Sequence, residues 1–153
     1  MRVDEKSTRF LVETWAIVRD HTITTILEEL EHPVWSKAEA AGVGAYLADI
    51  YMAMEQTLRT LIERVYGEKP VKDASWHERL LRRGFELELV PREIEQTVKG
   101  MLKYRHRMVH GYSSMLDERI IRKNAPEAIH AFRIFVRHVA TLLDIDFQMT
   151  SDG

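Results

Sequence analysis

One long segment decides the fold: residues 36–67, which read SKAEAAGVGAYLADIYMAMEQTLRTLIERVYG. Ser36 and Glu39 have the spacing of a capping box at its start, and Gly67 is a typical helix stop at its end. Between them, large apolar side chains recur at steps of three and four residues, which is the period of a helix with one buried face. They are Leu47, Ile50, Tyr51, Met54, Leu58, Leu61, Ile62 and Val65. The segment therefore predicts a long amphipathic helix that needs partners along one side.

Helical patterns flank this segment on both sides. An apolar stripe, with Phe10, Leu11 and Trp15 expected to face inward, predicts a helix over residues 7–30. Its centre, residues 22–25, is β-branched and forms helix less readily. After the long segment, Ser75 and Glu78 have the spacing of a second capping box, which predicts a short helix to about Arg83.

The C-terminal half follows the same pattern. Pro91 has the position of a first-turn proline and opens a helix that runs into residues 103–110. Residues 113–123 are mixed in character and are predicted to be a linker. Asn124, with a glutamate three residues later, predicts a third capping box, with Pro126 in the first turn of the last helix.

These elements together predict an all-α fold, a helical bundle of four long helices plus a short one. We find neither strand alternation nor an internal repeat. A chain of 153 residues is long enough for one real hydrophobic core. We therefore expect a single domain over residues 1–149 and a loose tail over residues 150–153.

Composition narrows the class of protein. The chain has no cysteine, which excludes disulfides and thiolate metal sites and is typical of a reducing cytosol. The sequence has no apolar run long enough to cross a bilayer and no signal-peptide core near Met1, so we expect a cytoplasmic protein. The net charge of −2 argues against a generally basic nucleic-acid binder.

Side chains that can bind phosphate or transfer protons are concentrated in residues 103–112, KYRHRMVHGY. Arg105 and His110 are five apart, about 140° of rotation and about 7.5 Å of rise, so they converge only near a helix end or with help from a second chain. His106 and His110 are four apart and share a face. The glycine that follows is a natural stop, which predicts that all three side chains line the last helical turn, with Tyr112 just beyond it.

Basic residues are also concentrated in and just before this segment. Lys99, Lys103, Arg105 and Arg107 are accompanied by no acidic residue between positions 99 and 107. Such a run predicts either a local phosphate-attracting patch or an ordinary solvated helix face.

The same arginine–histidine spacing recurs once more in the chain. Arg133 and His138 form the second pair, but alanine stands where Tyr112 stands in the first. The spacing alone is common by chance, so we interpret the second pair as a decoy on a helix face.

Residues 105–112 resemble the Arg-polar-x-x-x-His-x-Tyr motif of HEPN domains, in the branch called HepT. Trp76-His77-Glu78-Arg79-Leu80-Leu81 is also similar to the Trp-His-x-x-Leu-Leu stretch of the HepT-like subfamily. The resemblance covers most of the chain in length and helix order.

The resemblance implies a metal-independent endoribonuclease toxin without a cofactor. His110 would transfer protons, Arg105 would stabilise the transition state, and His106 would orient the site. Lys99, Lys103 and Arg107 are further candidates for contacts with RNA, because their charges attract phosphate.

The resemblance also implies two protein partners. One is a second copy of the chain, since HEPN proteins dimerise with their motifs facing each other. The other is an MntA-type nucleotidyltransferase antitoxin, which adds AMP to the motif tyrosine; the matching residue here is Tyr112, and Tyr112 would otherwise position RNA.

Three alternatives stay open on the sequence alone. His106 and His110 would serve a purely structural role if they bond the last carbonyls of the helix. Two histidines four apart can also chelate a metal, although we find no third ligand beside them. Finally, the chain would be a non-catalytic HEPN partner subunit if it only binds nucleotide or a nucleotidyltransferase.

Overall fold

A computed structural model shows the fold and describes residues 1–109 and 118–150. The described residues contain helices and no strand, which confirms the all-α prediction. The first rod is α1 (Glu5–Ile17), a π-helical segment η1 (Val18–Ile23) and α2 (Thr24–Leu30) in direct succession. It is followed by α3 (Lys37–Arg64), α4 (Trp76–Glu86), a 3₁₀ turn η2 (Arg92–Ile94), α5 (Glu95–Val109) and α6 (Glu118–Leu143). The described residues thus form four long helical rods and one short helix, α4.

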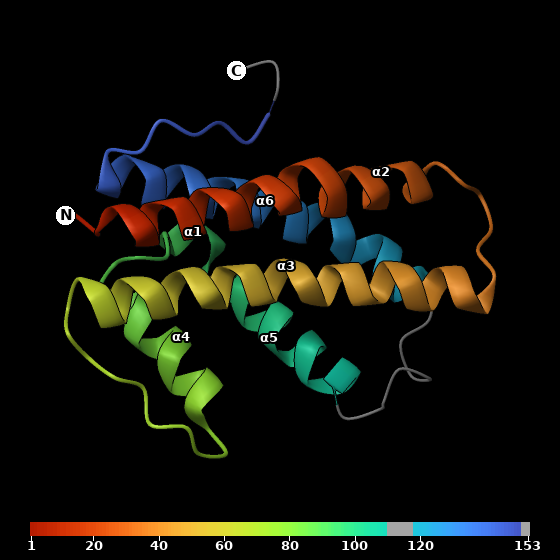
Figure 1. Cartoon of the computed structure of the whole chain (residues 1–153). Helices are drawn as coiled ribbons and strands as arrows, with labels where there is room; N and C mark the ends of the chain where they lie inside the picture. The colour runs from red at the N-terminus through yellow and green to blue at the C-terminus, as the bar shows by residue number, and fades with distance from the viewer. Residues whose placement is uncertain (110–117, 151–153) are drawn as a thin grey trace.

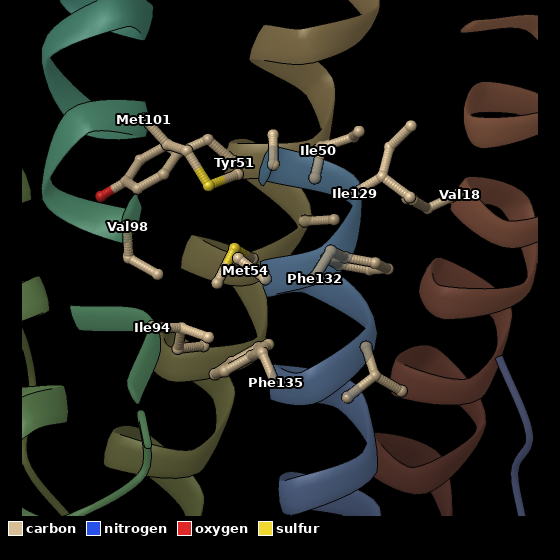
Figure 2. Close-up of a cluster of buried hydrophobic side chains, with 14 of the residues drawn as sticks. Val18, Ile50, Tyr51, Met54, Ile94, Val98, Met101, Ile129, Phe132 and Phe135 are labelled. Atoms are coloured by element: carbon tan, nitrogen blue, oxygen red, sulfur yellow. The ribbon is translucent and has the colours of Figure 1, made fainter. Parts of the chain in front are cut away.

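The long helix α3 lies at the centre of the bundle. It runs across the middle of Figure 1, with α1 and α2 on one side and α4 and α5 on the other, and it contacts all the other α-helices. Its predicted stripe is buried from Leu47 to Ile62. Figure 2 shows the central cluster, in which Ile50, Tyr51 and Met54 meet Phe132 and Phe135 from α6. The core therefore packs α5 and α6 against a single scaffold helix.

Local signals at the ends of α3 behave as the sequence predicts. The Ser36 hydroxyl accepts the Glu39 N–H at 3.1 Å, and the Glu39 carboxylate accepts the Ser36 N–H at 3.0 Å. Gly67 has a φ of +67°, the left-handed conformation that glycine adopts at least cost. At the N-terminus, Asp4 caps α1 by accepting the Ser7 N–H at 2.6 Å.

The N-terminal rod departs from a regular α-helix at its centre. The π-helical segment includes Thr22 and Ile23, at the predicted weak point. Beside it, the Trp15 indole N–H donates to the Thr57 hydroxyl at 3.0 Å inside the core. The predicted inward face needs one correction: Phe10 is 39 % exposed, whereas Leu11 and Trp15 are fully buried.

The second predicted capping box is wrong. Ser75 is the residue before α4, but its φ of −112° and ψ of 17° are not the extended conformation of a capping serine. Its N–H and hydroxyl both bond the Asp73 carboxylate, at 3.1 and 3.3 Å, so the hydroxyl is engaged in a local turn. The helix also continues past Arg83 to Glu86.

The third predicted capping box is also wrong, and so is the predicted linker over residues 118–123, the part of it that the structure describes. The last helix starts at Glu118, so residues 118–123 belong to it, and Asn124 and Pro126 lie inside the helix instead of at its start. The extra turns are held by tertiary contacts that sequence spacing cannot reveal. Glu118 accepts the Trp35 N–H at 2.9 Å and the Arg122 Nε–H at 2.8 Å, and Arg122 in turn donates to the carbonyls of Leu30 and His32.

No helix within residues 1–109 and 118–150 is long and apolar enough to span a membrane.

Candidate functional site

An open groove of about 850 Å³ lies between α4 and α5. Its lining includes five basic side chains and two histidines. They are Arg82, Lys99, Lys103, Arg105 and Arg107, with His77 and His106. Three acidic side chains, Glu78, Glu86 and Glu95, line it as well. The groove is therefore of mixed charge with a basic excess, which favours an anionic ligand.

The C-terminal half of α5 supplies the predicted basic residues. Lys103, His106 and Arg107 are exposed, and Arg105 is half-buried. All four line the groove. Within the described residues, the Arg105 Nε is buried and has no hydrogen-bond partner. Because Arg105 also lines the groove, its guanidinium charge can attract a phosphate there, whereas the buried Nε itself is closed to solvent.

Lys99 is engaged with its neighbours more than the sequence indicated. Its ammonium lies 3.5 Å from Glu95 and 5.5 Å from the centre of the Phe85 ring. The run of bases has no acid between positions 99 and 107, but Glu95 lies one helical turn earlier on the same face. An acidic side chain therefore lies beside the basic residues of α5 in the structure, although none lies between them in the sequence.

A buried carboxylate lies behind the groove. Glu55, on the inner face of α3, is only 7 % exposed. The His77 Nδ1 on α4 lies 2.8 Å from Glu55 Oε1. Because an ionised carboxylate only accepts hydrogen bonds, the Nδ1 carries the proton in this pair. The other carboxylate oxygen, Glu55 Oε2, is buried and has no hydrogen-bond partner among the described residues.

Electrostatics connect Glu55 to Arg105 through a buried tyrosine. Tyr51 lies one turn before Glu55 on α3, and Figure 2 shows its side chain extending from α3 toward α5. Burial and then the Glu55 charge raise the pKa of Tyr51, whereas the Arg105 charge lowers it. Both charges therefore act on the same phenol: α3 brings Tyr51 and Glu55 to this place, and α5 brings Arg105.

Tyr104, in the middle of the basic run, is a packing residue. It is 9 % exposed, and burial raises its pKa to about 12. It faces a smaller cavity of about 270 Å³ between α3, α5 and α6. It thus lies on the other side of α5 from the exposed Lys103 and Arg107.

The second arginine–histidine pair has a structural explanation. His138 Nε2 lies 2.8 Å from the carbonyl oxygen of Glu88. Glu88 has a φ of +57° in the turn after α4, so the contact fixes a strained turn against α6. Neither Arg133 nor His138 lines the groove between α4 and α5.

Comparison with known families accounts for this architecture. Residues 42–145 match the model of a family described as HepT-like protein, which is more than half of the chain. The chain belongs to the HepT-like protein family. The matched region contains most of α3 and all of α4, α5 and α6, and so both walls of the groove. No curated protein and no solved structure gives a match.

For this HepT-like protein, two predicted site residues lie outside the described residues. They are His110 and Tyr112, so the convergence of Arg105 with His110 stays a prediction, as does any metal chelation by His106 and His110. Lys99, Lys103, Arg105, His106 and Arg107 are all brought to the groove.

Sequence reasoning missed Glu55 and Tyr51 and gave His77 a role only by resemblance. A signal was present, because Glu55 is four residues after Tyr51 and one after Met54, within a stripe that is otherwise apolar. A charged residue on the inner face of a core helix needs a buried partner. That requirement indicated a buried polar site at Glu55, although it did not indicate which residue would pair with Glu55.

Proposed function

We propose that this HepT-like protein is a metal-independent endoribonuclease toxin that cleaves RNA in the groove at the end of α5. One observation carries the proposal: Arg105 lines an open groove together with His106, Lys103 and Arg107. Membership of the HepT-like family supports it. The proposed roles are those of phosphate binding for the basic residues and proton transfer for His110.

The reaction needs few groups. The ribose 2′-oxygen attacks the adjacent phosphorus, the bond from phosphorus to the 5′-oxygen breaks, and the products are a 2′,3′-cyclic phosphate and a 5′-hydroxyl. One group accepts the 2′-hydroxyl proton, one group donates a proton to the leaving oxygen, and a cation stabilises the pentacoordinate phosphorane. Arg105 supplies the cation, because its guanidinium keeps its charge and matches phosphate oxygens.

Two partners belong to the proposal. A homodimer would bring two copies of the motif into one cleft, and an MntA-type nucleotidyltransferase would act as the antitoxin. Transfer of AMP to Tyr112 would add an anion and a bulky nucleoside to the motif, which would repel RNA phosphates. His106 would orient the site, and Lys99, Lys103 and Arg107 would hold the RNA backbone.

The test is cleavage of RNA in the presence of a chelator. Transfer RNA and a messenger RNA are incubated with the wild type, Arg105→Ala and His110→Ala, and the product ends are identified. We expect cleavage by the wild type with 2′,3′-cyclic phosphate ends. Each variant should cleave about 100-fold more slowly or worse, the usual effect of losing a proton-transfer or charge-stabilising group.

Matched controls come from the second pair on α6. Arg133→Ala and His138→Ala remove the same residue types at the same spacing but outside the groove. Both should cleave at the wild-type rate at temperatures where circular dichroism shows them folded. Equal cleavage by the wild type and the two motif variants, or no cleavage of any RNA, would exclude the nuclease.

A non-catalytic HEPN partner subunit is the second candidate. The volume of the groove, about 850 Å³, is within the range of small-molecule sites, and its three acidic side chains oppose a long polyanion. This candidate predicts saturable binding of AMP or ATP at the groove without RNA cleavage. Titration calorimetry of the wild type and Arg105→Ala with each nucleotide distinguishes it from the nuclease.

A further inference from the structure

The Glu55–His77 pair has a geometry that helix packing alone does not require. Helices α3 and α4 already meet through apolar side chains, with Leu80 and Leu81 of α4 buried and Gly84 packed against Leu58. A carboxylate placed in such an interface loses its hydration, and a single charged hydrogen bond returns only part of that loss. Glu55 is therefore costly for stability where it stands.

The His77 ring contacts Glu55 and Trp76 and is partly exposed to the groove. Its Nδ1 is held by Glu55 at 2.8 Å, and the Trp76 ring lies with its centre 4.0 Å from the centre of the imidazole. The side chain keeps 27 % of its surface accessible and lines the groove. The tautomer with the proton on Nδ1 leaves Nε2 as the nitrogen that exchanges protons with a ligand.

The charges around the imidazole suit this role. Glu55 of α3 holds the ring nitrogen Nδ1, and Glu78 of α4 and Arg105 and His106 of α5 line the same groove as His77. The carboxylate of Glu55 stabilises the positive charge that the ring carries when Nε2 is also protonated. A histidine oriented by a buried carboxylate is an arrangement suited to proton transfer.

We propose that His77 is the proton donor to the leaving oxygen of the RNA, and that Glu55 is its positioning residue. This inference rests on the proposed ribonuclease function and names a residue for its second proton transfer. The base of that function takes the 2′-hydroxyl proton, the 2′-oxygen attacks phosphorus, and the bond from phosphorus to the 5′-oxygen breaks. His77 Nε2 gives its proton to that oxygen, so one proton enters the site and one leaves it in each turnover.

The test uses two RNA substrates that differ at one atom. In the first, the leaving atom is the ordinary 5′-oxygen; in the second, a bridging sulfur replaces it and departs without needing a proton. His77→Gln should cleave the ordinary RNA about 10²–10⁴-fold more slowly than the wild type, the range for loss of a general acid. It should cleave the sulfur substrate within about tenfold of the wild-type rate, because the missing proton is no longer needed.

Two further variants separate orientation from folding. Glu55→Gln keeps an acceptor for the Nδ1–H and removes the charge, so it should show a smaller loss with the same recovery on the sulfur substrate. His130→Gln removes an exposed histidine of α6 and should leave both rates unchanged. Thermal unfolding of each variant shows that rates are compared between folded proteins.

The outcomes distinguish this inference from the function on which it rests. If the wild type cleaves both RNAs and His77→Gln is slowed equally on both, His77 has only a structural role and the inference is overturned. If the wild type cleaves neither RNA, the ribonuclease proposal fails and the inference fails with it. Selective recovery on the sulfur substrate supports both.

Discussion

The position of α4, and with it the position of His77, depends on the close approach of Gly84 to α3. A Cβ added at Gly84 would lie 3.0 and 3.1 Å from the two terminal methyl carbons of Leu58 and 3.5 Å from a methyl carbon of Val90. Leu58 is 1 % exposed, so core atoms restrict its movement. Gly42 offers the matched control, because it is also helical but a Cβ there would meet nothing within 4 Å.

The expected magnitude follows from these distances. Alanine is preferred over glycine in a helix by about 1 kcal/mol, and both Gly42→Ala and Gly84→Ala gain this term. Gly42→Ala should therefore raise the free energy of unfolding by about 1 kcal/mol. Gly84→Ala must also displace Leu58, and overpacking of a filled core costs about 1–3 kcal/mol. The helix term cancels between the two variants, so Gly84→Ala should be roughly 1–3 kcal/mol less stable than Gly42→Ala.

Urea unfolding followed by far-ultraviolet circular dichroism measures this difference directly. The two variants should have similar slopes against urea and different midpoints, since neither changes the surface exposed on unfolding. Equal stabilisation of both variants would refute the reasoning, because α4 would then have room to accept a methyl group against α3. A loss of RNA cleavage by Gly84→Ala alone would further connect this contact to His77, about two helical turns earlier on α4.

Two other predictions concern the contacts that hold the bundle around the site. The hydrogen bond from the Trp35 N–H, and then Arg122, lower the pKa of Glu118 below its ordinary value of 4.5. The Glu118 carboxylate therefore contributes its full stabilisation above pH 4.5 and loses it as the pH falls through the lower pKa of the folded state. Glu118→Gln should thus unfold more easily than the wild type at pH ~7, and the gap should close below pH ~4.5; Glu127→Gln, an exposed change on the same helix, should show no such closing. Thr57→Val should cost about 1–3 kcal/mol in urea unfolding because it leaves the buried Trp15 indole N–H without its acceptor. Thr60→Val, which removes only a bond to the Gln56 carbonyl of the same helix, should stay within about 0.5 kcal/mol of the wild type.

Helix type and the inner face of α3 could be predicted from sequence because they depend on neighbours three and four residues apart. The capping box at Ser36 and the left-handed Gly67 are local features, and both appear in the structure as predicted. The start of α6 could not be predicted in this way. Glu118 and Arg122 stabilise the first turns through Trp35 and the end of α2, which are more than eighty residues earlier in the chain.

In the candidate site, too, features set by local spacing could be predicted from the sequence, whereas those set by tertiary packing could not. The cluster of basic residues on α5 follows from their spacing on one helix, and the structure brings them to one groove. The pairing of Glu55 with His77 required knowledge of which helix packs against the inner face of α3, and that choice is made by Leu58, Gly84 and their neighbours. An acidic residue inside an apolar stripe indicates that a polar partner exists, but it does not indicate which element supplies that partner. The apolar contact between α3 and α4 therefore decides which histidine is held by the buried carboxylate, and through it the chemistry that the groove can perform.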